Sequence, residues 1–310
     1  MTYTFLRYSS YLQEKYGGPV YRVPVDAGLG CPHRWEQFGI GGCRFCGESA
    51  GRASFVAPGD SISEQISKGI GFLRRRYKAN RFLLYFQAYS GTYGDTATLR
   101  KLYDTALAEE AFSELVVSTR PDCIDGSVAE LLSTYRTRER DVWVELGLQS
   151  ANEETLARIN RRHGLAEFEA AVDLLRAAGV KIAVHVMFGL PGEGLSECLS
   201  TIRYLNRFRP EGIKIHNVHV TSDAALSHDY RAGEITVPSA ERHLGYVVEA
   251  LQLLPPDTVI MRLTCDSDPG IRLAPRRFLE KQRFYREVED RLRALGVAQG
   301  SRYHEVQQCR

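Results

Sequence analysis

The stretch Cys31-Pro-His-Arg-Trp-Glu-Gln-Phe-Gly-Ile-Gly-Gly-Cys-Arg-Phe-Cys46 carries three cysteines with the spacing C-x11-C-x2-C. It lies in a glycine-rich segment, residues 27–59, that has no regular pattern of apolar residues. An irregular segment of about 30 residues in a compact domain is usually functional. A β-branched run, Val20–Val25, precedes it, and α/β folds place their binding sites where strands end. We therefore expect a functional site in this segment.

On both sides of the segment, short β-branched runs alternate with longer amphipathic runs. Strands separated by helices of about 12–20 residues indicate βαβ units and a parallel sheet. Six or seven such units favour a barrel over an open sheet, although spacing alone does not decide closure. We expect strands at Val20–Val25, Arg81–Gln87, Glu114–Thr119, Asp141–Leu148, Val180–Phe188, Gly212–Val220 and Thr258–Leu263. We expect helices at Ser61–Lys78, Thr96–Glu110, Gly126–Arg138, Glu153–Asn160, Leu165–Ala178, Leu195–Phe208, Ser239–Leu254 and Pro275–Leu295.

The composition is that of an ordinary globular protein. The chain has 310 residues, of which 44% are hydrophobic and 25% are charged, and its net charge is +2. The total charge therefore gives no argument for nucleic-acid binding. No apolar run reaches the roughly 20 residues that cross a bilayer, and the first residues do not resemble a signal peptide. We expect a cytoplasmic protein with no membrane partner.

The chain has seven cysteines, and an odd number without an export signal argues against a disulfide framework. Three interpretations of the clustered cysteines stay open. Structural zinc normally takes four protein ligands, so it would need His33 or a distant cysteine. A [4Fe–4S] cluster normally takes four thiolates, so three would leave one iron open for a small chelating ligand. The thiols could also be unligated; the spacing and the loop position favour the cluster.

Motifs along most of the chain resemble one protein family. The loop motif C-P-H-R…G-G-C-R-F-C is similar to the C-P-N-R…G-G-C-x-F-C loop of radical S-adenosylmethionine (SAM) proteins of the bacterial YhcC/YtqA/MnmL group. The radical SAM domain of the elongator catalytic subunit shares some of these motifs and looks like a more distant relative. Collinear motifs over residues 20–280 are more specific than any single motif. The further pieces are YFQAYS (85–90), STRPDC (118–123), WVELGLQS (143–150), GLPGE (189–193), IKIH (213–216) and RLT (262–264).

The resemblance implies an α/β fold, namely a partial (β/α)6 TIM-like radical SAM barrel with a C-terminal helical extension. Residues 1–235 would form the core barrel, with the cluster loop at 27–59. Residues 236–310 would form the extension, packed on the barrel.

The resemblance also implies the cofactors. Cys31, Cys43 and Cys46 would hold one [4Fe–4S] cluster, and SAM would bind its fourth iron. Reductive cleavage of SAM would give methionine and a 5′-deoxyadenosyl radical. The electron would come from a donor such as flavodoxin or ferredoxin.

Several residues are expected around SAM on the same ground. Phe45 matches the aromatic residue that lines the adenine side in the family, and Gly189 belongs to a turn near the adenine. Gln149 and Arg161 have the Gln-x11-Arg spacing of the oxygen-independent coproporphyrinogen oxidases, in which both contact SAM. A planar guanidinium suits a carboxylate. His185 falls where those oxidases place an aspartate near the ribose, although a histidine on a strand is often a core residue.

Ser118 stands where those oxidases carry a glutamate that meets the SAM ammonium group. Gln87 or Ser90 would have to take over that contact. Glu145 shares a strand face with Gln149, and a buried carboxylate needs a partner. Ligand binding and a salt bridge inside the barrel are equally good interpretations of Glu145.

Characterised members of the group act on tRNA. The MnmL type converts 5-carboxymethylaminomethyl-2-thiouridine at the wobble position to 5-aminomethyl-2-thiouridine. The resemblance therefore implies a tRNA substrate, whose single-stranded anticodon loop can be unstacked. Two alternatives stay open: a radical SAM enzyme acting on a metabolite or peptide, and a non-catalytic zinc-stabilised RNA-binding module. The candidate substrate contacts are Arg120, Asp122, Lys214 and His216.

Overall fold

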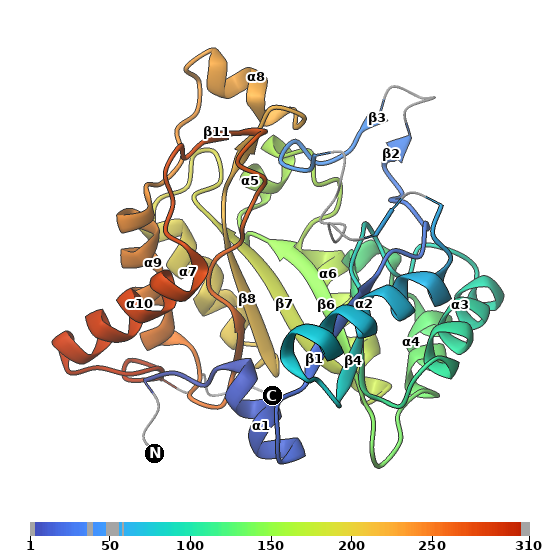
Figure 1. Ribbon diagram of the computed structural model, residues 1–310. Helices are drawn as coiled ribbons and strands as arrows, with labels where there is room; N and C mark the ends of the chain where they lie inside the picture. The colour runs from blue at the N-terminus through green and yellow to red at the C-terminus, as the bar shows by residue number, and fades with distance from the viewer. Residues whose placement is uncertain (1–3, 36–39, 48–55, 58, 305–310) are drawn as a thin grey trace.

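The computed structural model describes residues 4–35, 40–47, 56–57 and 59–304. Seven strands form one sheet in the order β1-β4-β5-β6-β7-β8-β10, and every neighbouring pair is parallel. The sheet curves into a half-barrel with β1 and β10 at its edges (Figure 1). The expected α/β partial barrel is confirmed. The strands are β1 (Tyr21–Val25), β4 (Phe82–Phe86), β5 (Phe112–Thr119), β6 (Asp141–Gln149), β7 (Lys181–Phe188), β8 (Gly212–Asn217) and β10 (Val259–Arg262).

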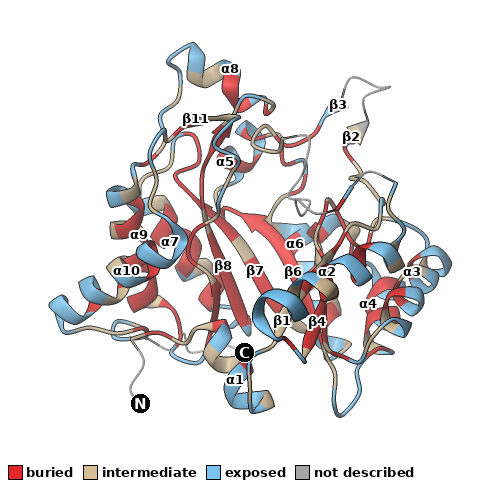
Figure 2. Ribbon diagram, in the orientation of Figure 1, coloured by how far each residue is buried: buried red, intermediate tan, exposed pale blue. Residues whose placement is uncertain are grey.

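Helices cover the outer face of the sheet (Figures 1 and 2). Strand β4 shows why its sequence is apolar throughout. Phe82, Leu84 and Phe86 pack into the main core under the helices, whereas Leu83 and Tyr85 point to the inside of the barrel. The covering helices are α2 (Ile62–Tyr77), α3 (Thr96–Ala108), α4 (Gly126–Ser133), α6 (Leu165–Ala177), α7 (Leu195–Asn206), α9 (Ala240–Leu253) and α10 (Lys281–Leu295).

A short N-terminal helix, α1 (Tyr8–Tyr16), closes the amino end of the barrel. Its Tyr8 and Leu12 pack with Trp143, which is fully buried, and with other inward-facing residues of the sheet. The sequence analysis did not predict α1, because nine residues with few apolar positions give a weak helical signal. This packing leaves the carboxyl ends of the strands as the open end of the barrel.

A small layer, which we call the cap, lies above that open end (Figure 1). It consists of β9 (Val220–Thr221), α8 (Leu226–Arg231) and β11 (Arg272–Ala274), and β9 pairs with β11 in antiparallel fashion. The strand expected at Gly212–Val220 therefore ends early, at Asn217, because the chain turns into the cap. Near the mouth the chain also forms α5 (Glu153–Arg158) and a short helical turn, Pro121–Cys123.

The helix expected at Pro275–Leu295 begins later than predicted, at Lys281. Pairing of β11 with β9 keeps the chain extended up to Ala274. Glu280 then caps the helix by accepting hydrogen bonds from the next backbone N–H groups. The segment 27–59 contains a two-residue antiparallel pair, β2 (Arg34–Trp35) with β3 (Ile40–Gly41).

The boundary expected at residue 235 stays a prediction. Segment 236–310 supplies β10, which is the last strand of the same sheet, as well as α9 and α10. Within the described ranges, no helix is both long and apolar enough to cross a bilayer.

Candidate active site

The cysteine loop leaves β1 at the carboxyl edge of the sheet and is fixed to the turn that follows α5. The N–H of Arg44 donates to the carbonyl of Ile159 at 3.0 Å. The side-chain amide of Asn160 donates to the carbonyl of Gly42 at 2.7 Å. Gly42 has φ +75°, a conformation that favours glycine, and this allows the turn into Cys43. The loop and the turn after α5 are therefore held together.

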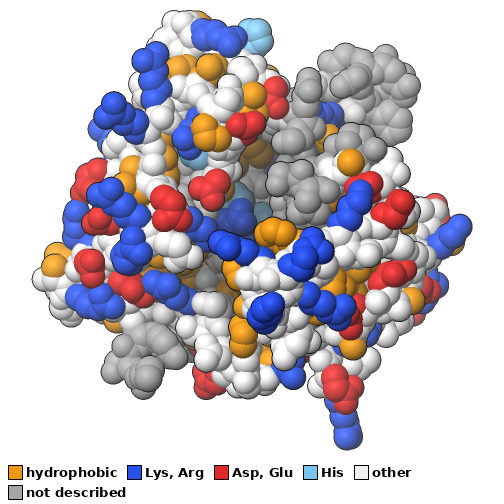
Figure 3. All heavy atoms as spheres, viewed as in Figure 1, with side chains coloured by type: hydrophobic (Ala, Val, Ile, Leu, Met, Phe, Trp, Pro, Cys, Tyr) orange, Lys and Arg blue, Asp and Glu red, His pale blue; other side chains and the backbone are white. Residues whose placement is uncertain are grey.

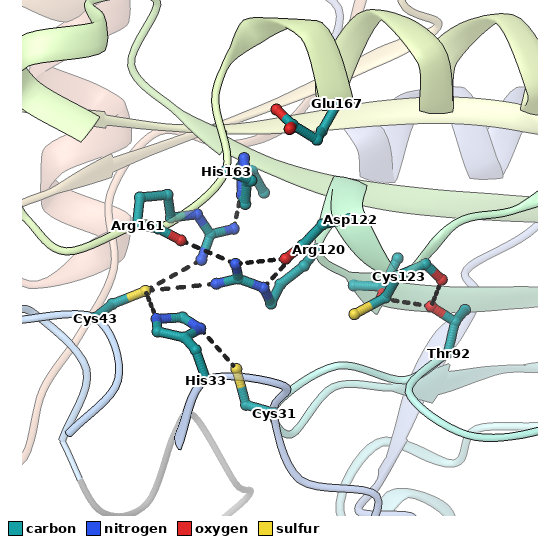
Figure 4. A network of polar contacts seen from close by, with 12 residues as sticks. Cys31, His33, Cys43, Thr92, Arg120, Asp122, Cys123, Arg161, His163 and Glu167 are labelled. Carbon is teal, nitrogen blue, oxygen red and sulfur yellow. Dashed lines mark hydrogen bonds and ion pairs between the residues drawn. The ribbon is translucent and has the colours of Figure 1, made fainter. Parts of the chain in front are cut away.

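His33 lies between Cys31 and Cys43 (Figure 4). Its Nδ1 is 3.7 Å from the sulfur of Cys31, and its Nε2 is 3.6 Å from the sulfur of Cys43. In the part of the chain that the structure describes, no three His, Cys, Asp or Glu side chains have the spacing of ligands to a single metal ion. The zinc site completed by His33 is therefore not preformed among these side chains.

Three guanidinium groups face the thiols. Arg161 Nη1 is 3.3 Å and Arg120 Nη1 is 3.8 Å from the sulfur of Cys43. Arg34 Nη1 is 3.7 Å from the sulfur of Cys46. Arg120 is fixed by a two-pronged contact with Asp122, 2.8 Å on both prongs (Figure 4). The loop sulfurs therefore lie in a positive environment, which stabilises thiolates and any anionic group that they hold.

The pKa values of the thiols follow from these contacts. Burial disfavours the Cys43 thiolate, but the charge of Arg161 and a hydrogen bond with His33 outweigh it and lower the pKa of Cys43 to about 6. Burial is also outweighed at Cys31, where the hydrogen bond with His33 lowers the pKa. Burial and the nearby Cys43 raise the pKa of Cys46 to about 11. Cys43 is therefore a thiolate at neutral pH.

The end of β6 brings Gln149 and Arg161 together. Gln149 has φ +76°, an uncommon conformation for a residue with a side chain. Gly147 makes room for both, because a Cβ there would lie 2.6 Å from Arg161 Nη2 and 2.7 Å from Gln149 Nε2. Arg161 Nε is buried without a hydrogen-bond partner among the described residues. A buried donor of this kind beside the thiols suits a carboxylate ligand.

Glu145 lies deeper in the barrel, four positions before Gln149 on β6, and it is fully buried. It forms an ion pair with Lys214, which is 1% exposed. It also accepts a hydrogen bond from the Tyr85 hydroxyl at 2.6 Å and contacts His185 Nε2 at 2.9 Å. His216 packs beside His185, with ring centroids 5.3 Å apart. These residues form one polar group inside the barrel.

The electrostatics of this polar group favour an ionised Glu145. Burial raises its pKa, but the Lys214 charge and the contact with His185 hold the pKa well below its usual value. Arg22 adds a further positive charge and stacks over the Tyr85 ring at 4.4 Å. Glu145 therefore has the salt bridge inside the barrel, while its Oε1 is buried without a partner among the described residues.

The remaining expected contacts lie around the mouth. Phe45 packs in the apolar group under the cap. Gly189 has φ +84° and lies against Pro238, whose Cγ would be 2.2 Å from a Cβ at this position. Ser90 is fully buried, and Gln87 follows β4, where its N–H donates to the carbonyl of Val25. Contact of these four residues with SAM stays a prediction.

Sequence reasoning missed three residues of the site. Arg34 faces Cys46, and Tyr85 and Arg22 belong to the polar group around Glu145. The position of Tyr85 was available as a signal, because it lies two residues before Gln87 and therefore on the same strand face. Arg34 lies in the loop motif itself, but its contact with Cys46 depends on how the loop folds back.

Two family models match the chain. The model described as the radical SAM superfamily matches residues 28–205, more than half of the chain, and the model of the radical SAM C-terminal domain matches residues 210–294. The chain belongs to the radical SAM superfamily. Within it, protein YhcC of Escherichia coli (strain K12) is 34% identical over 264 residues, which are 85% of this chain and 84% of YhcC.

Further relatives of this radical SAM protein cover between 68% and 97% of the chain. The uncharacterized protein MJ0486 of Methanocaldococcus jannaschii is 30% identical, over 97% of this chain and 93% of that protein. The tRNA uridine(34) acetyltransferase of Dehalococcoides mccartyi is 26% identical, over 68% of this chain and 44% of that protein. The structure of the archaeal Methanocaldococcus infernus Elp3 matches with a TM-score of 0.69 at 17% identity, over 90% of this chain and 64% of that chain. This structural match shows a shared fold.

Radical SAM membership implies SAM and a [4Fe–4S] cluster, and the residues at the mouth fit both groups. Three thiols on one loop supply soft ligands. The guanidinium groups of Arg120 and Arg161 suit the negative charge of a cluster held by three thiolates. The unpartnered Nε of Arg161 leaves a donor for a SAM carboxylate.

Proposed function

We propose that this radical SAM enzyme modifies the wobble uridine of tRNA, converting 5-carboxymethylaminomethyl-2-thiouridine to 5-aminomethyl-2-thiouridine. The observation that carries the choice of substrate class is the similarity over 68% of the chain to a tRNA uridine(34) acetyltransferase. Similarity to elongator complex protein 3, at 28% identity over 51% of the chain for the mouse protein, supports the same class.

In this proposal Cys31, Cys43 and Cys46 hold the cluster. The cluster and SAM, when bound, supply the 5′-deoxyadenosyl radical that abstracts a hydrogen atom from the substrate. Arg161 binds the SAM carboxylate through its unpartnered Nε. Arg120, fixed by Asp122, keeps a positive charge beside Cys43.

The other residues of the site orient ligands and exclude water. Gln149 lies at the strand end next to Arg161 and contacts SAM from β6. Phe45 and Gly189 lie at the adenine side, His185 lies near the ribose, and Gln87 or Ser90 contacts the SAM ammonium group. The polar group of Glu145, Lys214 and His216 forms the inner end of the substrate chamber.

The cluster assignment is tested by anaerobic reconstitution. The wild-type protein should bind iron and sulfide, become brown, and cleave SAM to 5′-deoxyadenosine after reduction by dithionite or by flavodoxin. Cys43→Ala should lose both colour and cleavage. Cys265→Ala is the matched control, because Cys265 lies outside the loop and its thiol donates to the backbone carbonyl of Asn217 at 3.3 Å. A colourless wild-type protein that holds only zinc would refute the enzyme and favour the zinc-stabilised module.

The substrate is tested by mass spectrometry of nucleosides from the tRNA of a strain that lacks the gene. The expected result is accumulation of 5-carboxymethylaminomethyl-2-thiouridine and loss of 5-aminomethyl-2-thiouridine, reversed by the wild-type gene but not by the Cys43→Ala gene. Unchanged wobble nucleosides, together with SAM cleavage by the purified enzyme, would instead indicate a metabolite or peptide substrate.

A further inference from the structure

The cap contains a cavity of about 420 Å³ that lies between α8 and the segment leading into β11. Figure 3 shows several Lys or Arg side chains on the surface that α8 and β11 form. The cavity has the size of a typical small-ligand pocket, and three of its six lining residues are arginines. Its lining residues are Tyr230, Arg231, Pro269, Arg272, Leu273 and Arg276.

The three arginines of this cavity are not neutralised. In the described part of the chain, no ion pair is formed by Arg231, Arg272 or Arg276. Both acidic side chains next to the cavity in sequence have other contacts. Asp229 forms an ion pair with Arg44, and Asp268 accepts the N–H of Gly270 at 2.8 Å.

Some surface arginines pair with carboxylates, as Arg74 does with Glu110 and Arg291 with Glu241, whereas others, such as Arg100 on α3, form no ion pair among the described residues. The feature that sets Arg231, Arg272 and Arg276 apart is that all three line one cavity. Guanidinium groups repel one another, so an anion bound among three of them is stabilised because it offsets their charge. The planar fork of arginine binds two oxygens of a phosphate at once. The lining of the cavity is therefore chemically suited to a phosphate group or to several phosphate groups.

The cavity is joined to the cysteine loop. The N–H of Leu226, the first residue of α8, donates to the carbonyl of Arg44 at 2.8 Å, and the Arg44 side chain pairs with Asp229 of the same helix. Phe45 belongs to the apolar group that also contains Tyr230 and Leu273 of the cavity wall. A phosphate bound in the cap is thus held beside the loop that carries the reactive centre.

We propose that the cap cavity binds backbone phosphates of the RNA substrate and so positions the stem-loop over the barrel mouth. This inference rests on the proposed function, because it takes the substrate to be tRNA. Phosphate contacts give an RNA-binding protein most of its affinity and set the position of the RNA, whereas the base is recognised elsewhere. In this protein the base enters the barrel, and the arginines of the cap hold the backbone.

The test uses the full chain with its reconstituted cluster and a synthetic anticodon stem-loop RNA labelled with a fluorophore. Fluorescence anisotropy gives the Kd at several salt concentrations. The double variant R272A/R276A should weaken binding at least about tenfold and reduce the slope of log Kd against log salt by about 1 to 2, because about two counterions fewer are released. The variant R272K/R276K should recover part of the affinity, because charge remains without the planar fork.

The matched control is R100A/K101A, which removes two positive charges from another surface cavity, of about 540 Å³, on α3. It should leave both the Kd and the salt slope unchanged. All variants are compared at equal iron content, so that loss of the cluster is not mistaken for loss of RNA binding.

The outcomes separate this inference from the proposed function. RNA binding that is equal in wild type and R272A/R276A would overturn the cap site and leave a tRNA substrate standing. Binding that depends on the cap arginines, in an enzyme whose deletion leaves every wobble nucleoside unchanged, would overturn the proposed reaction and keep the cap as an RNA site. Absence of RNA binding by the wild-type enzyme would overturn both.

Discussion

The guanidinium group of Arg161 lies 3.3 Å, through Nη1, from the sulfur of Cys43, although 118 positions separate the two residues in the chain. Nη2 of the same side chain donates to the carbonyl of Gly147 on β6 at 2.5 Å. Nε has no partner among the described residues. Arg161 thus contacts the loop with one nitrogen and the sheet with a second, and it keeps a third for a ligand.

Replacing Arg161 by Ala is expected to weaken SAM binding by about 10- to 100-fold. A charge-assisted hydrogen bond contributes about 1.5–3 kcal/mol, and the substitution removes it from a buried position. Iron content should stay close to that of the wild type, because Arg161 is not a thiolate ligand. The measurement is the Kd of SAM, taken anaerobically by equilibrium dialysis with the reconstituted protein.

Arg162→Ala is the control for this prediction, because Arg162 is the exposed neighbour and donates only to Asn160 among the described residues. It should bind SAM as the wild type does. A wild-type Kd for Arg161→Ala would remove Arg161 from the SAM site. A large loss of iron in Arg161→Ala would assign it to cluster retention instead.

Gly147→Ala is expected to reproduce the Arg161→Ala defect without touching a charge. The added Cβ would lie 2.6 Å from Arg161 Nη2, so the guanidinium must move away from Cys43. SAM affinity should fall by about tenfold, in line with the loss of one such hydrogen bond. The same dialysis measures it, and thermal unfolding shows whether the variant is folded.

Gly245→Ala is the matched control, because Gly245 lies in α9 and an added Cβ there meets nothing within 4 Å. Alanine favours a helix over glycine by about 1 kcal/mol, so this variant should be as stable as the wild type or more stable. Unchanged SAM affinity in Gly147→Ala would show that the position of Arg161 is not critical.

The sequence predicted the sheet well because its signals are local. A strand such as Phe82–Phe86 is apolar on both faces, and the central strands β4, β5, β6 and β7 are each followed by a helix. The late start of α10 at Lys281 could not be read in the same way. It follows from the pairing of β11 with β9, whose residues are about 50 positions apart, and no local pattern encodes that pairing.

The residues of the site also differ in whether the sequence could predict them. The three loop cysteines were predicted from their spacing, and Arg161 was predicted from the resemblance to enzymes that carry the Gln-x11-Arg pattern. The partner of Glu145 was not, because Lys214 comes from β8, two strands away, and meets Glu145 only after the sheet has curved. Sequence could say that a buried carboxylate needs a partner, but it could not identify that partner.

Glu145→Gln is expected to destabilise the fold by about 3–5 kcal/mol. The substitution leaves Lys214 buried without its counter-ion, and an unpaired buried charge is costly. The double variant Glu145→Gln/Lys214→Met also removes the unpaired charge of Lys214. It should recover more than half of the free energy of unfolding that Glu145→Gln loses. Urea unfolding of each single variant and of the double variant gives the coupling. Additive effects in this cycle would show that the two side chains do not stabilise each other.

Stability in acid is expected to depend on Asp141, which pairs with Lys15 of α1 and with Lys181 at the start of β7. Burial raises its pKa, but hydrogen bonds from both lysines outweigh burial and lower the pKa. The unfolded carboxyl titrates near about 3.9. Its contribution is therefore complete above that pH and is lost as the pH falls through the lower folded value.

Asp141→Asn should accordingly lower the free energy of unfolding by about 1 kcal/mol at pH 7, a size that reflects partial exposure of the pair. The difference in the free energy of unfolding between Asp141→Asn and the wild type should become smaller below about pH 4, because the wild-type carboxyl takes up its proton there. Thermal unfolding at pH 7, 5 and 3 measures it. Asp257→Asn is the control, because Asp257 is 71% exposed and lies 3.6 Å from Arg209; its effect should be under about 0.5 kcal/mol at every pH. The difference in the free energy of unfolding between Asp141→Asn and the wild type could also be as large at pH 3 as at pH 7. That result would mean that the amide disturbs packing and that the charge of Asp141 contributes nothing.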